Sequence, residues 1–132
     1  MTPSSSTLPV WPEIAVQAWE QREGPVILAT ASVTGIPNAV YLGVAGRTPE
    51  GRIYLANNYF HKTLSNLTEN PEASLLFKTT EGRSFQLKGR ISFLSTGPLF
   101  DAMKAINPPR HPGHSAAVID VHAIYSGEKQ LM

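Results

Sequence analysis

The segment from Ser84 to Leu94 constrains the fold most, because its side chains alternate between apolar and polar with a period of two. The apolar set and the polar set that interleaves with it are Phe85, Leu87, Ile91 and Phe93, and Gln86, Lys88, Arg90 and Ser92. A strand of this kind buries one face and exposes the other, which is typical of an antiparallel sheet. Gly89 interrupts the apolar face and therefore indicates a bulge or a sharp bend.

Five further β-prone runs accompany this strand, at residues 26–31, 38–44, 52–56, 73–79 and 116–125. Turn sequences separate several of them, namely Thr34-Gly35, Thr48 to Gly51 and Glu81-Gly82. The first three runs follow one another closely, which predicts an antiparallel meander. In the last run, Ile119, Val121, Ala123 and Tyr125 are expected to share one face. The pattern predicts a mainly β fold, a small six-stranded antiparallel barrel with a few short helices.

Two helices are expected outside the centre of the chain. The first begins at Pro12, carries an apolar stripe at Ile14, Ala15, Ala18 and Trp19, and is closed by Gly24-Pro25. We expect it to plug or flank the barrel. The second follows Pro98 with apolar residues at helical spacing and stops at Asn107-Pro108-Pro109.

The central stretch, Ile53 to Leu76, is typical of a strand, a tight turn, a short helix and another strand. The helix starts at His61, places Leu64 and Leu67 on one face, and ends at Asn70-Pro71. Its first turn holds Lys62 and Thr63 but no carboxylate, although the positive end of a helix dipole favours a negative charge. An anion such as a phosphate group, bound by the lysine, the hydroxyl and free backbone amides, resolves this conflict. A solvated lysine on a surface helix is the alternative.

Length and composition exclude several classes of function. The chain of 132 residues fits one domain, 11–132, after a flexible Ser/Thr/Pro tail at 1–10. The 11 basic residues against 10 acidic residues form no basic run, so nucleic acid is not an expected partner. No apolar run reaches the ~18 residues of a membrane span, and no signal peptide is visible. With no cysteine, the plain expectation is a cytoplasmic protein without disulfides or thiolate metal sites.

The central stretch resembles the FMN-binding split barrels of the pyridoxamine 5'-phosphate oxidase-like family. Three groups of residues carry the resemblance: Asn58-Tyr59 before the helix, His61-Lys62-Thr63 at its start, and Leu67-Thr68-Glu69-Asn70-Pro71 at its end. The likeness continues through residues 83–89 and the last strand. It implies a six-stranded antiparallel Greek-key split barrel that binds FMN between the two subunits of a homodimer. It also implies an oxidoreductase or electron-transfer protein that acts on a small-molecule substrate or a protein partner.

The resemblance also implies which residues contact the cofactor. The expected set is Thr30, Asn38, Val40, Tyr41, Ala56, Asn57, His61, Lys62, Thr63, Ser84 and Gln86. Lys62 and Thr63 would hold the phosphate, while the backbone at Ala56 and Asn57 would run beside the flavin. Ser84 and Gln86 would reach it, often from the partner subunit. Val40 stands where related oxidases carry a phosphate-contacting arginine, which weakens the expected phosphate clamp.

Several alternatives remain open at the level of sequence. A split barrel can bind haem or deazaflavin, or hold flavin without catalysis. The chain lacks the C-terminal Arg-Pro segment of pyridoxamine-phosphate oxidase, so that activity is not expected. His111 and His114 have no third ligand at a recognisable spacing, so no metal site is expected. The alternative role for these two histidines is to face the flavin. His122 is expected to be structural, paired with Asp120.

Overall fold

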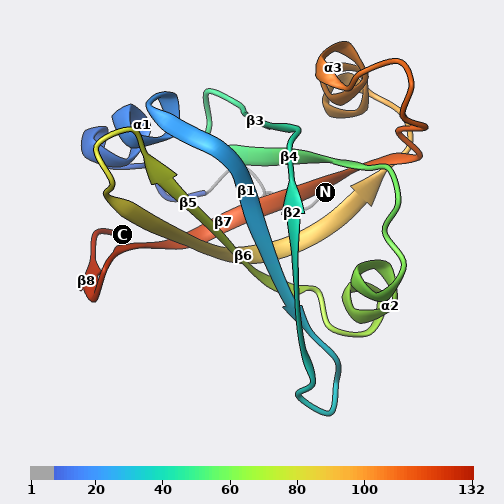
Figure 1. The fold of residues 1–132 in the computed structure, drawn as a ribbon, viewed down its shortest axis with the longest axis horizontal. Helices are drawn as coiled ribbons and strands as arrows, with labels where there is room; N and C mark the ends of the chain where they lie inside the picture. Colours follow the sequence, from blue (N-terminus) through green and yellow to red (C-terminus); the bar gives the residue numbers. More distant parts are fainter. Residues whose placement is uncertain (1–7) are drawn as a thin grey trace.

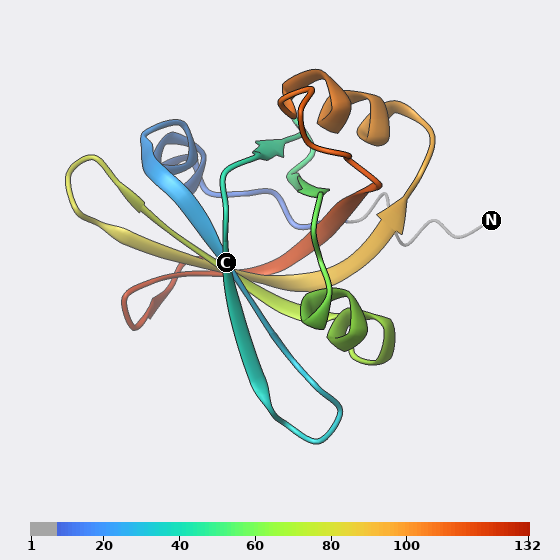
Figure 2. The same ribbon diagram turned by 45° about the vertical axis from the view of Figure 1, so that its right-hand side comes forward.

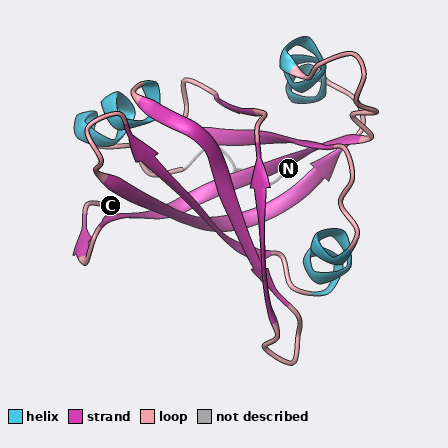
Figure 3. Cartoon of the chain, in the orientation of Figure 1, coloured by secondary structure: helices cyan, strands magenta, loops and turns pink. Residues whose placement is uncertain are grey.

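The computed structural model describes residues 8–132 and shows a mainly β protein with three helices at its periphery (Figures 1 and 3). Of the predicted tail at 1–10, residues 1–7 lie outside the described residues. The elements in chain order are α1 (Glu13–Glu20), β1 (Arg22–Ala31), β2 (Pro37–Leu42), β3 (Ala45–Arg47), β4 (Arg52–Asn57), α2 (Lys62–Glu69), β5 (Glu72–Thr79), β6 (Ser84–Leu94), α3 (Pro98–Ile106), β7 (Ser115–Ser126) and β8 (Lys129–Gln130). No helix in this range has the length and apolarity needed to cross a membrane.

All the strands join one curled antiparallel sheet in the order β2-β1-β5-β6-β7-β4-β3, with β8 paired to β7. Its edge strands β2 and β3 are joined by Gly43 and Val44 alone. Leu42 and Ala45 are therefore at most about 11 Å apart, which requires the sheet to curl until its edges approach. The result is an open-sided barrel (Figure 2), so the predicted split barrel is confirmed. The sheet has eight strands instead of the expected six because β3 and β8 are too short to show a pattern.

The predicted meander is only partly right. β1 and β2 form the expected antiparallel hairpin, with Ala29 opposite Ala39. β4, however, pairs with β3 and β7 at the other edge of the sheet. The chain leaves β2 at Gly43 and crosses the opening of the barrel, so strands that are adjacent in sequence are not adjacent in the sheet.

Helix α1 ends earlier than the sequence predicts. It stops at Glu20, and Gly24-Pro25 lies inside β1, where the register with β5 shifts between Glu23 and Ile27. Gly24 has φ +74°, a conformation that favours glycine and marks this irregularity. Ala15, Ala18 and Trp19 are buried as expected, but Ile14 is exposed. The helix flanks one end of the sheet (Figure 1).

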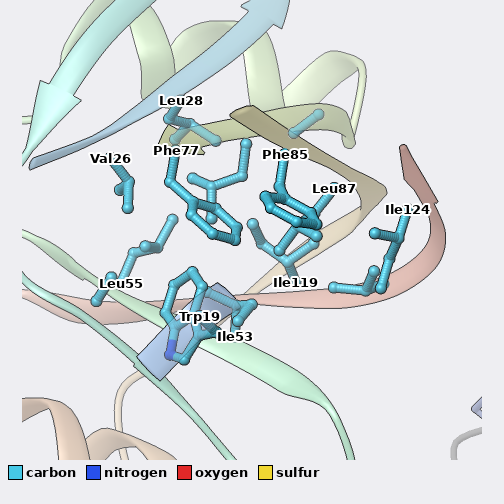
Figure 4. Packing of buried hydrophobic residues seen from close by; sticks show 14 of the residues in the cluster. Trp19, Val26, Leu28, Ile53, Leu55, Phe77, Phe85, Leu87, Ile119 and Ile124 are labelled. Carbon is cyan, nitrogen blue, oxygen red and sulfur yellow. The ribbon is translucent and has the colours of Figure 1, made fainter. Parts of the chain in front are cut away.

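Aromatic rings fill the core between α1 and the sheet (Figure 4). The ring of Trp19 meets Phe77 edge-on, with centroids 5.2 Å apart, and Phe77 stacks on Phe85 at 5.6 Å. The Arg22 guanidinium lies 4.0 Å from the centre of the Trp19 ring and donates hydrogen bonds to two backbone carbonyls. Burial lowers the pKa of Arg22 from its ordinary value. This packing fixes the end of the barrel remote from α2.

The bulge predicted at Gly89 is present between β6 and β7. Gly89 pairs with Val121 while Lys88 pairs with Ala123, which leaves His122 as the extra residue. The extra residue reverses the faces beyond it, so Ile124 joins the core and the prediction that Ala123 and Tyr125 continue the Ile119 face was wrong.

The expected pairing of His122 with Asp120 was also wrong. The carboxylate of Asp120 accepts a 2.8 Å hydrogen bond from Nε of Arg52. His122 lies 3.5 Å from Glu72 instead. Arg52 lies on β4, which pairs with β7, and Glu72 lies on β5, two strands away from β7. Sequence spacing reveals neither partner.

Candidate functional site

A pocket of about 660 Å³ lies along the open side of the barrel, between β2, the segment that joins β4 to α2, and the loop after α3. Its size is in the range of small-molecule sites. The residues that line it are Asn38, Val40, Tyr41, Leu42, Gly43, Val44, Ala56, Asn58, Tyr59, Phe60, His61, Lys62, Thr63, Pro108, Arg110 and His111. Among these described residues, none carries a carboxylate, whereas two carry permanent positive charges. The pocket is therefore suited to a negatively charged ligand.

The N-terminus of α2 forms one wall of this pocket. The helix starts at Lys62 and ends before Asn70, as the sequence predicts. No side chain caps its N-terminus, and its first turn holds no acidic residue. Lys62 is exposed and has no hydrogen-bond or ion-pair partner among residues 8–132. The free amides and the lysine together supply donors for an anion.

Thr63 is buried beside Lys62 and held by β2. Its Oγ1 accepts a 3.0 Å hydrogen bond from Nδ2 of Asn38. Because the oxygen is occupied as an acceptor, the hydroxyl proton remains available to a second group in the pocket. The contact joins two residues that the sequence predicted separately.

The loop from Asn107 to His114 forms the opposite wall, and it is fixed to the segment before α2. The amides of Asn58 and Asn107 exchange hydrogen bonds of 3.0 and 2.9 Å. Oδ1 of Asn58 also accepts the backbone N–H of Gly113 at 2.8 Å. These contacts carry Arg110 and His111 into the pocket.

Sequence reasoning did not assign Asn58, Tyr59, Phe60 and Arg110 to the cofactor site, and it placed His111 near the flavin only as an alternative to a metal site. Asn58 and Tyr59 appeared only as part of the family motif, although they precede the helix start directly. Arg110 carried no local signal, because only the fold brings its loop to the pocket.

Four of the predicted cofactor residues lie outside the pocket of this chain. Thr30 is buried behind α2, where its Oγ1 accepts a 3.1 Å hydrogen bond from Asn66. Asn57 is buried and shapes the turn, since its amide contacts Ser115 and the backbone N–H of Phe60. Ser84 and Gln86 lie on β6, exposed and half-buried respectively. The other seven, Asn38, Val40, Tyr41, Ala56, His61, Lys62 and Thr63, line the pocket together.

The histidine loop shows no convergent ligand set. His111 is hydrogen-bonded to Tyr59, and His114 is exposed. Within the described range, 8–132, no group of three His, Cys, Asp or Glu side chains could hold a metal ion.

The fold defines a split barrel, and comparison with known proteins gives its family. Residues 13–126 match the family described as pyridoxamine 5'-phosphate oxidase. The chain therefore belongs to that family, as the sequence motifs indicated.

Individual relatives agree with this assignment. The chain is 30% identical to an uncharacterized protein of Methanocaldococcus jannaschii, MJ0282, over 76% of this chain and 71% of that one. Among solved structures it is similar to an FMN-binding protein from Syntrophomonas wolfei, with a TM-score of 0.69 and 20% identity over 76% and 75% of the two chains. It is also similar to HutZ, the heme storage protein of Vibrio cholerae, with a TM-score of 0.62 and 15% identity over 89% and 95%. At these identities the structural likeness shows the fold alone.

The residues of the pocket fit a flavin mononucleotide by their chemistry. The uncapped helix, Lys62 and Thr63 match a phosphate group, which accepts several charge-assisted hydrogen bonds. Tyr41 and Phe60 contribute aromatic side chains to the lining, which suits a planar ring system.

Proposed function

We propose that this protein binds FMN in the pocket along the open side of its barrel and acts as a flavin-dependent oxidoreductase or electron-transfer protein. One observation carries the proposal: the N-terminus of α2 is uncapped and opens, with an unpaired Lys62, into a pocket whose described lining residues include no carboxylate. An N-terminus of this kind favours a phosphate dianion. Membership of the pyridoxamine 5'-phosphate oxidase family supports the same cofactor.

In this proposal each residue of the chain has a defined task. Lys62, the Thr63 hydroxyl and the free amides of α2 bind the phosphate, and Asn38 orients the hydroxyl. The edge of β2 at Val40 and Tyr41 and the β4 end at Ala56 lie along the ring. The bound flavin supplies the electron-transfer chemistry, while the protein fixes its position and excludes water.

The outer face of the sheet supports a homodimer. An apolar row that is partly open to solvent crosses three strands on this face. In it, Ile27 of β1 lies opposite Tyr41 of β2 on one side and opposite Leu76 of β5 on the other. Gln86 continues the row on β6. Exposed apolar surface of this kind is typical of an interface. In the proposed dimer, Ser84 and Gln86 act from the second copy, which accounts for their distance from the pocket of their own chain.

Haem is the second candidate, and one observation favours it. His61 and His111 both line the pocket and could present an imidazole to a haem iron. The likeness to a heme storage protein is a likeness of fold. Deazaflavin is the third candidate, and the mass of the extracted cofactor separates it from FMN.

The visible spectrum of the purified protein tests the cofactor. We expect the absorption bands of oxidised flavin. A Soret band in their place would show that the bound cofactor is haem and would contradict the FMN proposal.

A titration of cofactor-free protein with FMN tests the phosphate site. We expect Lys62→Ala to weaken binding by about 1.5–3 kcal/mol, or roughly 10- to 100-fold, because it removes a charged hydrogen bond. Lys78→Ala is the control, since Lys78 is an exposed lysine on β5 outside the pocket. Equal affinity in the two variants would refute the assigned role of Lys62.

A further inference from the structure

Tyr59 and His111 form a hydrogen-bonded pair in the wall of the pocket. The Tyr59 hydroxyl lies 3.0 Å from Nδ1 of His111, and the two rings meet edge-on with centroids 5.6 Å apart. The residues come from different segments, one before α2 and one after α3. Both line the pocket together with Lys62 and Thr63.

The backbone on each side of this pair is held in place. Beside Tyr59, Asn58 exchanges two amide hydrogen bonds with Asn107, which is buried. In the loop that carries His111, the backbone N–H of His111 donates to the carbonyl of Pro108 at 3.0 Å. The backbone N–H of Gly113 donates to Oδ1 of Asn58 at 2.8 Å. The position of the pair is therefore set by the fold, although the Tyr59 side chain itself is 70% exposed.

The Tyr59–His111 pair can pass a proton from one side chain to another, which the groups proposed to bind the phosphate are not arranged to do. With no carboxylate among the described lining residues, the imidazoles of His61 and His111 supply the ring nitrogens of this pocket that can accept or donate a proton. In the described range only His111 is hydrogen-bonded to a second side chain that carries an acidic proton, the phenol of Tyr59. When Nδ1 of His111 holds a proton, it donates to the phenol oxygen and leaves the phenol O–H free to point into the pocket.

We propose that Tyr59 is the catalytic proton donor to a planar conjugated carbonyl acceptor, of the quinone class, and that His111 is its positioning residue. This inference rests on the proposed function. The acceptor takes a hydride from reduced flavin and needs one proton to complete a two-electron reduction. The exposed aromatic ring of Tyr59, which adjoins the donated proton and lies in the pocket, suits a planar acceptor.

The proton transfer is balanced within the pair. The O–H bond of Tyr59 breaks as its proton passes to the acceptor oxygen, which becomes a hydroxyl group. The phenol oxygen takes the Nδ1 proton of His111 while Nε2 of the same ring takes a proton from solvent, so the imidazole stays neutral. Proton exchange with solvent then restores the Nδ1–H tautomer. The acceptor gains one hydride and one proton, while the protein returns to its starting state.

A comparison of two acceptors in single-turnover experiments tests the donor. FMN-loaded protein is reduced anaerobically with dithionite and mixed with either menadione, which takes up protons, or ferricyanide, which takes up electrons alone. We expect Tyr59→Phe to slow menadione reduction about 10²-fold, as loss of a general acid does, and to leave ferricyanide reduction within about twofold of wild type. The solvent isotope effect on menadione reduction should decrease in the same variant. Tyr54→Phe, on β4 and outside the pocket, is the control.

The imidazole ¹⁵N spectrum of cofactor-free protein gives a readout that needs no turnover. We expect Tyr59→Phe to shift the His111 Nδ1 signal and Tyr54→Phe to leave it unchanged. His111→Asn keeps a donor near the phenol but cannot relay a proton, so its menadione rate should lie between those of wild type and Tyr59→Phe.

The outcomes separate this inference from the proposed function. If FMN binds but Tyr59→Phe reduces menadione at the wild-type rate, the proton donor is overturned and the cofactor site stands. If FMN does not bind at all, both fail.

Discussion

Nδ2 of Asn38, on the edge strand β2, donates a 3.0 Å hydrogen bond to Oγ1 of Thr63, in the first turn of α2. The bond joins the edge strand of the sheet to the helix start that forms one wall of the pocket. It occupies the acceptor side of a buried hydroxyl and leaves the proton for a ligand. The orientation of Thr63 therefore depends on a residue 25 positions earlier in the chain.

Replacement of Asn38 tests this relationship. We expect Asn38→Leu to lower FMN affinity by about 0.5–1.5 kcal/mol, or roughly 2- to 13-fold, because the Thr63 hydroxyl loses its fixed orientation. Asn66→Leu is the matched control. It removes the hydrogen bond that the Asn66 side-chain amide donates to Oγ1 of Thr30, behind α2 and outside the pocket. Isothermal titration of FMN into each variant measures the difference. A loss of affinity in the control as large as in Asn38→Leu would contradict the orientation argument.

Replacement of Leu76 tests the dimer. Leu76 is 41% exposed on the outer face of β5, so a glutamate there is tolerated by the fold but places a charge in the apolar row. We expect Leu76→Glu to convert a dimer into a monomer in size-exclusion chromatography with light scattering. Lys78→Glu, on the same face of the same strand, should remain dimeric. A monomeric wild-type protein would remove the dimer from the proposed function.

Replacement of Gly89 tests the bulge. A Cβ atom at this position would collide with the backbone oxygen of Asp120, which cannot move without disturbing the β6–β7 pairing. We expect Gly89→Ala to reduce the free energy of unfolding in urea by about 1–3 kcal/mol or more, the cost of overpacking. Gly43→Ala, where a Cβ meets no atom within 4 Å, should change stability little. Equal stability of the two variants would show that the pairing can relax.

The ionisation of Glu50 should contribute to the pH dependence of the free energy of unfolding. Hydrogen bonds from its own backbone N–H and from the Thr48 hydroxyl, with a contribution from Arg52, lower its pKa from the ordinary 4.5. Because the folded pKa lies below the unfolded value, the stabilisation is present above pH 4.5 and is lost as the pH falls through the folded pKa. Urea unfolding of Glu50→Gln should therefore show a smaller loss of stability on acidification than wild type. An identical slope in both proteins would argue that the carboxylate is free.

Local sequence was sufficient for the elements whose signals lie within a few residues. The alternation of Ser84 to Leu94 predicted β6 and its inward face, and Gly89 predicted the bulge. The sequence also predicted a helix that begins near Lys62, without a carboxylate in its first turn, and ends at Asn70, as α2 does. In each case the physical cause is short-range: side-chain period, turn geometry or the field of one helix terminus.

Tertiary structure decided everything that depends on which strands meet. It placed β4 between β7 and the edge strand β3, far from β2 in the sheet order, paired Asp120 with Arg52, and moved Tyr125 away from the Ile119 face. It also brought Arg110 and His111 beside α2, where Tyr59 bonds to a histidine 52 residues away. Closure of a sheet is a property of the whole barrel, because register and curvature are shared by all its strands. For that reason the sequence alone determined the local elements of this protein and the positive end of its site, while only the folded chain determined the second wall of the pocket.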